Sequence, residues 1–191
     1  MGKEKSNSIF IIVAGAGAAG KSALICQFTI GRFVEVDPYV GDEYSKDITI
    51  NGLPHRLRIF DCAGCDEYFD MGLCVLDKAN GFIFVYDITK RDTFEEACSL
   101  NKYYVEKMGL QSPKDLRVVV CGNKCDIADQ RQIDASEGRS FADLYGYDFF
   151  ETSAKTGLNV EEAFVRIAER CIADNSFCKK EEKRRGNCTI C

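Results

Sequence analysis

The chain has 191 residues and a net charge of −5, and 46% of its residues are hydrophobic while 29% are charged. This length suits one domain with a full-sized core. No apolar run reaches the ~18 residues of a membrane span, the polar N-terminus lacks the apolar core of a secretory signal, and the acidic balance argues against general nucleic-acid binding through a basic surface.

The predicted elements alternate between strand and helix. Residues 9–14 form a continuous apolar run typical of a buried strand, and a Gly/Ala-rich turn and a helix over 21–30 follow it. Residues 45–50 and 56–61 alternate in polarity on either side of Asn51-Gly52, a hairpin turn signal. Further buried strands are predicted at 81–87 and 116–122, and helices at 68–78, 92–107, 136–145 and 160–173.

This order predicts a layered α/β domain with a mostly parallel sheet, helices on both faces and one antiparallel edge strand. We expect a polar extension over residues 1–7, one domain over 8–173, and a disordered tail over 174–191, where apolar residues become scarce.

The eleven cysteines do not resemble a disulfide scaffold. Seven of them sit in or beside predicted strands and helices, namely Cys26, Cys62, Cys65, Cys74, Cys98, Cys121 and Cys171. Without a secretion signal, the expectation is reduced thiols in the cytosol, most of them small core residues.

The stretch Gly15 to Ser22 has the pattern G-x-x-x-x-G-K-S, directly after a buried strand and opening a helix. Small residues let backbone N–H groups close around phosphate oxygens, and the helix N-terminus adds partial positive charge. Lys21 is placed to reach the β- and γ-phosphates, and the Ser22 hydroxyl to bind Mg²⁺. The alternative, a merely tight strand–helix turn, does not require the full motif in this context.

Two further motifs follow later strands. In Asn123-Lys124-Cys125-Asp126, a carboxylate can accept both N–H groups of a guanine edge, a pair that adenine lacks. Asn123 can contact the other edge of the base, and the Lys124 stem can lie along the ring. The backbone of Ser153-Ala154-Lys155, in the stretch that begins at Thr152, can close the base pocket from the far side.

With these motifs in order, the chain resembles a Ras-type small GTPase from about Ser8 to Cys191. The resemblance implies a P-loop fold with a six-stranded sheet and five helices, binding of GTP or GDP with Mg²⁺, and two switch loops that sense the γ-phosphate. It also implies that Phe33 packs beside the guanine and that Asp61 holds Mg²⁺ through a water. The implied nucleotide-binding residues are Gly15, Gly17, Ala18, Ala19, Gly20, Lys21, Ser22, Ala23, Phe33, Gly64, Asn123, Lys124, Asp126, Ser153, Ala154 and Lys155.

The implied catalytic residues are Lys21, Gly64 and Cys65, but Cys65 departs from the family. It stands where the family has the glutamine that orients the attacking water, in Asp61-Cys62-Ala63-Gly64-Cys65-Asp66-Glu67-Tyr68. A cysteine is shorter and its S–H is a weak donor, so Cys65 is not expected to position the water. Cys62-x-x-Cys65 also leaves open a second interpretation, a redox pair with a lowered thiol pKa.

The first switch departs as well. Tyr39 occupies the place of the threonine that ligates Mg²⁺ and senses the γ-phosphate, and no Ser or Thr lies between Gly31 and Tyr44 to replace it. The metal contact at Tyr39 is therefore expected to be weakened. Residues 37–44 are the expected effector segment, although Gly41 alters it. Gly17 leaves room for the arginine finger of a GTPase-activating protein.

The last four residues, Cys188-Thr189-Ile190-Cys191, form a C-a-a-X prenylation signal. One lipid holds a membrane only marginally, and Cys178 is a candidate palmitoylation site beside a run of +3 charge. These features predict a lipid-anchored monomer at the cytoplasmic face of the plasma membrane. The N-terminus is a poor match to the myristoylation pattern, and His55 is interpreted as a surface residue.

The leading hypothesis is a GTP/GDP switch that hydrolyses GTP slowly and works with an exchange factor, an effector and a GTPase-activating protein. The alternative is a binding module that holds GTP or GDP without hydrolysis and serves as a scaffold. A P-loop ATPase or kinase conflicts with Asn123-Lys124-Cys125-Asp126.

Overall fold

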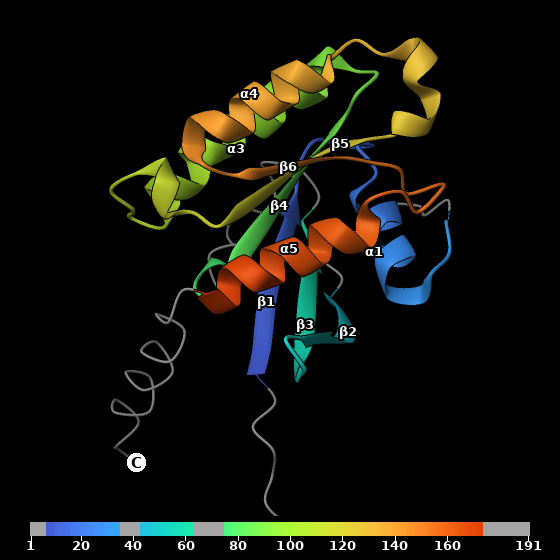
Figure 1. Cartoon of the computed structure of the whole chain (residues 1–191). Helices are drawn as coiled ribbons and strands as arrows, with labels where there is room; N and C mark the ends of the chain where they lie inside the picture. The colour runs from blue at the N-terminus through green and yellow to red at the C-terminus, as the bar shows by residue number, and fades with distance from the viewer. Residues whose placement is uncertain (1–6, 35–42, 63–74, 174–191) are drawn as a thin grey trace, which may run out of the picture.

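The computed structural model describes residues 7–34, 43–62 and 75–173. Its centre is a six-stranded sheet in the order β2-β3-β1-β4-β5-β6 (Figure 1). The strands are β1 (Asn7–Ala14), β2 (Glu43–Ile50), β3 (Leu53–Asp61), β4 (Gly81–Asp87), β5 (Val118–Asn123) and β6 (Asp148–Thr152). The α-helices in the described residues are α1 (Lys21–Ile30), α3 (Arg91–Lys107), α4 (Ala135–Tyr145) and α5 (Val160–Ala173). Short 3₁₀ turns, η2 (Pro113–Asp115) and η3 (Cys125–Gln130), flank β5.

The sheet is parallel except at one edge, as the sequence predicts. β1 pairs in parallel with β3 and β4, and β5 with β4 and β6, while β2 pairs antiparallel with β3. The β2–β3 turn is made by Asn51 and Gly52, whose φ angles of 51° and 77° match a left-handed hairpin turn. The predicted fold class is therefore confirmed.

Side chains that alternate along the central strands pack into two separate hydrophobic cores, one on each face of the sheet. Ile9, Ile11 and Val13 of β1 face one side, where α1 and α5 cover the sheet. Phe10 and Ile12 face the other side, under α3 and α4 (Figure 1). Every residue of β4 is buried, because both of its faces are covered. This two-sided packing fixes the carboxyl ends of the parallel strands along one edge.

Two details differ from the sequence-based expectations. His55 is not a surface residue: it is only 5% exposed. β3 begins at Leu53, so the inward-facing alternation that includes Leu57 and Ile59 extends back to His55. The predicted helix over 68–78 lies mostly outside the described residues. Among the helices that are described, none combines the length and the apolar composition needed to cross a bilayer.

Candidate nucleotide-binding site

The candidate site lies where the parallel strands end. β1 leads into the loop from Gly15 to Gly20, β5 ends at Asn123, and β6 ends at Thr152. In open α/β sheets, ligands bind at the carboxyl ends of such strands. The three motifs found in the sequence are thus brought to one edge of the sheet.

The loop after β1 is held so tightly that two of its positions need glycine. A Cβ on Gly15, at a φ of +150°, would lie 2.0 Å from the carbonyl oxygen of Val85. A Cβ on Gly20, at a φ of +93°, would lie 2.3 Å from Nδ2 of Asn123. Gly17 differs, because nothing lies within 4 Å of an added Cβ there. The loop therefore approaches β4 and β5 through backbone contacts and leaves Gly17 open.

Lys21 opens α1 and folds back over this loop. Its side chain is buried at 5% exposure, and its ammonium donates to the carbonyl oxygens of Gly15 and Ala16, at 2.8 Å each. Because α1 begins at Lys21, directly after Gly20, its N-terminus adjoins the same loop. A helix N-terminus beside a fixed ammonium is an anion-binding arrangement.

Ser22 and Asp61 meet beside the loop. The Ser22 hydroxyl donates to Oδ2 of Asp61, which ends β3 and is 2% exposed. The sequence separates these residues by 39 positions, and the parallel pairing of β1 with β3 brings them together. Hydroxyl and carboxylate oxygens are the ligands that Mg²⁺ prefers.

Asn123 ties the loop after β1 to the loop after β6. Its buried amide donates to the carbonyl oxygen of Ala19 at 2.9 Å. Its Oδ1 accepts from the Ala154 N–H at 3.2 Å and from the Thr152 hydroxyl at 3.4 Å. Asn123 thus fixes the spacing between the phosphate motif and the base motifs, while its contact with a base stays a prediction.

Asp126 is exposed but held on one side. One carboxylate oxygen accepts from the buried Ser153 hydroxyl at 2.6 Å. That hydroxyl also accepts from the Thr156 N–H at 3.1 Å. The exposed carboxylate is therefore oriented before any ligand arrives. Phe33, the predicted neighbour of the base, is 47% exposed, and Lys155 is exposed as well.

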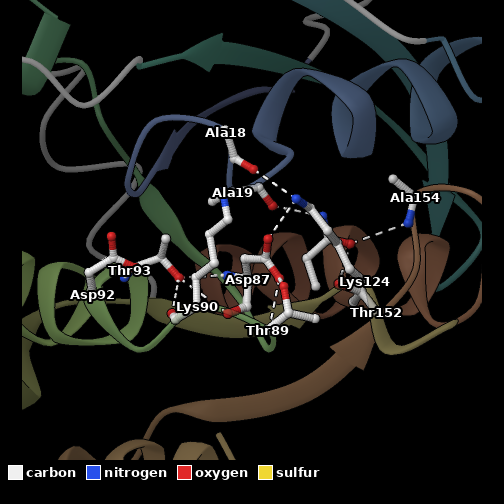
Figure 2. Close-up of polar contacts among 11 residues, drawn as sticks. Ala18, Ala19, Asp87, Thr89, Lys90, Asp92, Thr93, Lys124, Thr152 and Ala154 are labelled. Atoms are coloured by element: carbon white, nitrogen blue, oxygen red, sulfur yellow. Dashed lines mark hydrogen bonds and ion pairs between the residues drawn. The ribbon is translucent and has the colours of Figure 1, made fainter. Parts of the chain in front are cut away.

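Lys124 lies between the loop after β1 and Asp87, a residue that the sequence analysis did not single out. Its ammonium donates to the Ala18 carbonyl oxygen at 3.0 Å and forms an ion pair with Oδ2 of Asp87 at 2.6 Å (Figure 2). Asp87 ends β4 and is fully buried. A carboxylate closing an otherwise apolar strand is the one sequence signal that could have found it.

Cys62 follows β3, and its thiol is poorly suited to redox chemistry. Burial raises the pKa of Cys62, and this effect outweighs the hydrogen bond with Tyr104 and the positive charge of Lys21, both of which lower that pKa. A reactive thiol needs a lowered pKa, so Cys62 does not support the redox-pair interpretation. Its proposed partner, Cys65, lies outside the described residues.

Several other predicted residues also fall outside the described part of the chain. They are Tyr39, Gly64, the effector residues 37–42, and the lipidation candidates Cys178 and Cys188.

Comparison with known proteins defines the class. A sequence model of the Ras family matches residues 10–173. The Ras-related protein R-Ras of Mus musculus is 39% identical over 158 residues, which cover 82% of this chain and 71% of the relative. R-Ras of Rattus norvegicus matches with the same identity and coverage. The chain belongs to the Ras family of small GTPases, and it is therefore a GTP-binding switch protein.

Proposed function

We propose that this chain binds GTP and GDP together with Mg²⁺ and hydrolyses GTP slowly. The observation that carries the binding proposal is the convergence of Lys21, Asn123 and the Ser153-held Asp126 at one edge of the sheet. Lys21 would belong to a phosphate site, and Asn123 and Asp126 to a guanine site. Hydrogen bonds already fix all three side chains. Preorganisation of this kind lowers the cost of binding.

The nucleotide would lie across the strand ends. The backbone N–H groups of the loop after β1, with Lys21, would hold the phosphates, while Asp126 would accept the two guanine N–H groups. The backbone around Ala154 would close the base pocket. Phe33 and the Lys124 stem would cover the two faces of the base. Inosine nucleotides lack the exocyclic amine that Asp126 would read, so they should bind more weakly.

The donor set fits Mg²⁺. Ser22 and Asp61 supply the hard oxygen atoms that this ion prefers, and a hydrogen bond holds them together. Ser22 would hold the ion directly and Asp61 through a water. The ion would neutralise charge on the β- and γ-phosphates. Tyr39 would make a poor third ligand, because a phenol oxygen lies too far from its backbone to replace a threonine hydroxyl.

The slow hydrolysis is argued from side-chain chemistry at Cys65. An amide donates and accepts hydrogen bonds at once and reaches farther than a thiol. Without such a group, the attacking water is not oriented. An arginine finger accelerates GTP hydrolysis by ~10³–10⁵-fold in a complete site, and we expect a smaller acceleration here.

Single-turnover phosphate release from GTP-loaded protein tests this proposal, with and without Mg²⁺. We expect release roughly tenfold or more below that of a Ras-type GTPase assayed in parallel, and acceleration in the Cys65→Gln variant. A normal, Mg²⁺-dependent rate in the unmodified chain would refute slow hydrolysis. GTP binding with no release at all would instead support the scaffold alternative.

The ends of the chain complete the proposal. Because β1 begins at Asn7 rather than after it, we place residues 1–6, together with 174–191, outside the domain, and assign prenylation to Cys188 and palmitoylation to Cys178. Together they would anchor a monomer at the cytoplasmic face of the plasma membrane. There the chain would meet an exchange factor, an effector through residues 37–44, and a GTPase-activating protein. Loss of membrane recovery in a Cys188→Ser variant is the expected result, and unchanged recovery would refute the anchor.

A further inference from the structure

The Lys124 ammonium joins the end of β4 to the loop after β1, because it pairs with the Asp87 carboxylate and also donates to the Ala18 carbonyl oxygen. Asp87 is the last residue of β4, and its register partner is Asn123, the residue directly before Lys124. Lys124 itself has a left-handed backbone, with a φ of 67°. Such a conformation is uncommon for lysine. With this backbone, the Lys124 ammonium donates a hydrogen bond to the Ala18 carbonyl oxygen and forms an ion pair with the Asp87 carboxylate (Figure 2).

The Asp87 carboxylate is held in place by contacts of its own. Its Oδ1 accepts from the Thr89 N–H at 2.9 Å and from the Thr89 hydroxyl at 2.7 Å. The Asp87 N–H donates to the Thr93 hydroxyl at 3.0 Å, which connects this strand end to α3. These bonds leave Oδ2 facing the Lys124 ammonium, as Figure 2 shows.

The burial of the two partners is unequal. The Asp87 side chain is 1% exposed, whereas that of Lys124 is 32% exposed. Burial by itself would raise the pKa of Asp87, but the hydrogen bonds from Lys124 and Thr89 outweigh it, and the pKa of Asp87 lies below its usual value. The carboxylate is therefore charged, and together with the Ala18 carbonyl oxygen it holds the Lys124 ammonium in place.

We propose that Asp87 is a positioning residue for the guanine nucleotide, because it holds the Lys124 side chain against the loop after β1, where base and ribose would rest. The inference rests on the proposed nucleotide binding, and it deepens it. Asp87 would not touch the ligand. It would slow nucleotide release by keeping Lys124 in its bound position before and after the ligand arrives.

Release of a fluorescent GDP analogue from the full chain, chased with excess GDP, tests the proposal. Asp87→Asn keeps the shape of the side chain but removes its charge, and charge-assisted hydrogen bonds are about twice as strong as neutral ones. We expect about tenfold faster release. Asp148→Asn is the matched control. Like Asp87, Asp148 forms ion pairs with basic side chains, here Arg166 and Arg170, but it lies at the amino end of β6. Its release rate should equal that of the unmodified chain.

The second part separates positioning from general loosening of the fold. Lys124→Met keeps most of the stem and removes the charge. If Asp87 acts through Lys124, adding Asp87→Asn to Lys124→Met leaves the release rate unchanged. This comparison also carries the test if Asp87→Asn alone folds poorly, because the double variant contains no unpaired buried charge.

Faster release with Asp87→Asn alone, and none added in the Lys124→Met background, supports the proposal. Release at the unmodified rate in Asp87→Asn, or further acceleration in the double variant, overturns it. Failure of the unmodified chain to bind GDP would overturn the proposed function itself, and the first measurement of the series would reveal it.

Discussion

Replacing Gly20 with alanine is expected to damage both stability and nucleotide binding. The new Cβ would lie 2.3 Å from Nδ2 of Asn123, at a backbone φ of +93°. The left-handed backbone costs an alanine about 1–2 kcal/mol. Displacing Asn123 also breaks its buried 2.9 Å hydrogen bond to Ala19, and an unsatisfied buried group costs about 1–3 kcal/mol. The free energy of unfolding should therefore fall by about 2–5 kcal/mol.

Gly17→Ala is the matched control, because nothing lies within 4 Å of its added Cβ. Its free energy of unfolding should stay within about 0.5 kcal/mol of the unmodified chain. Urea unfolding measures stability, and titration with a fluorescent GDP analogue measures affinity. Relieving the clash at Gly20 displaces either the loop or the Asn123 side chain, and both belong to the proposed site, so GDP affinity in Gly20→Ala should fall about tenfold or more. Equal effects at Gly17 and Gly20, or none at Gly20, would refute this account of the loop.

Two other predictions concern the α3–α4 side of the sheet. The Tyr147 hydroxyl lies 2.6 Å from Oδ1 of the buried Asn101 and 2.7 Å from the Pro113 carbonyl oxygen. Tyr147→Phe removes both hydrogen bonds, so the free energy of unfolding measured in urea should fall by about 1–3 kcal/mol. The rate of GDP release should stay unchanged. The hydrogen bond from Arg91, with a second from the Asp134 N–H, lowers the pKa of Glu137 to about 2, so its stabilising effect is present above about pH 4.5 and is lost as the pH falls toward 2. The unmodified chain should therefore exceed Glu137→Gln in urea midpoint at about pH 6, with a gap that narrows on acidification; a gap independent of pH would contradict this sign.

The strands and most helices could be predicted because their residues carry strong local patterns. β4 is a continuous apolar run, and α1 and α5 begin and end where the sequence indicates. The tight loop after β1 could be predicted because Gly15 and Gly20 occupy positions where any Cβ would collide with β4 or with the Asn123 side chain of β5. Such a requirement leaves a local trace in the sequence.

Tertiary partners leave a much weaker trace, because the sequence can mark a polar strand end without naming the residue that it contacts. Asp87 reads as an ordinary polar strand end, and its partner Lys124 is 37 residues away, a pairing that only the parallel register of β4 and β5 creates. His55 follows Pro54 near a turn and reads as exposed. It is buried because β3 begins before it, beside β1 and β2. In both cases the neighbouring strands, rather than the local sequence, decide the burial.

The two halves of the site are built differently, and this bears on how such a switch would be timed. Asn123, Lys124 and Asp126 are each fixed by a partner on a different segment, namely Ala19, Asp87 and Ser153. The residues that depart from the family, Tyr39 and Cys65, lie outside the described part of the chain, and our proposal assigns them to sensing and hydrolysis of the γ-phosphate. The proposed guanine contacts use neither of these residues, so binding would persist where hydrolysis is weak. When hydrolysis is slow, the lifetime of the bound state is limited by nucleotide release. The groups that hold Lys124 in place would then help to set the timing of the switch.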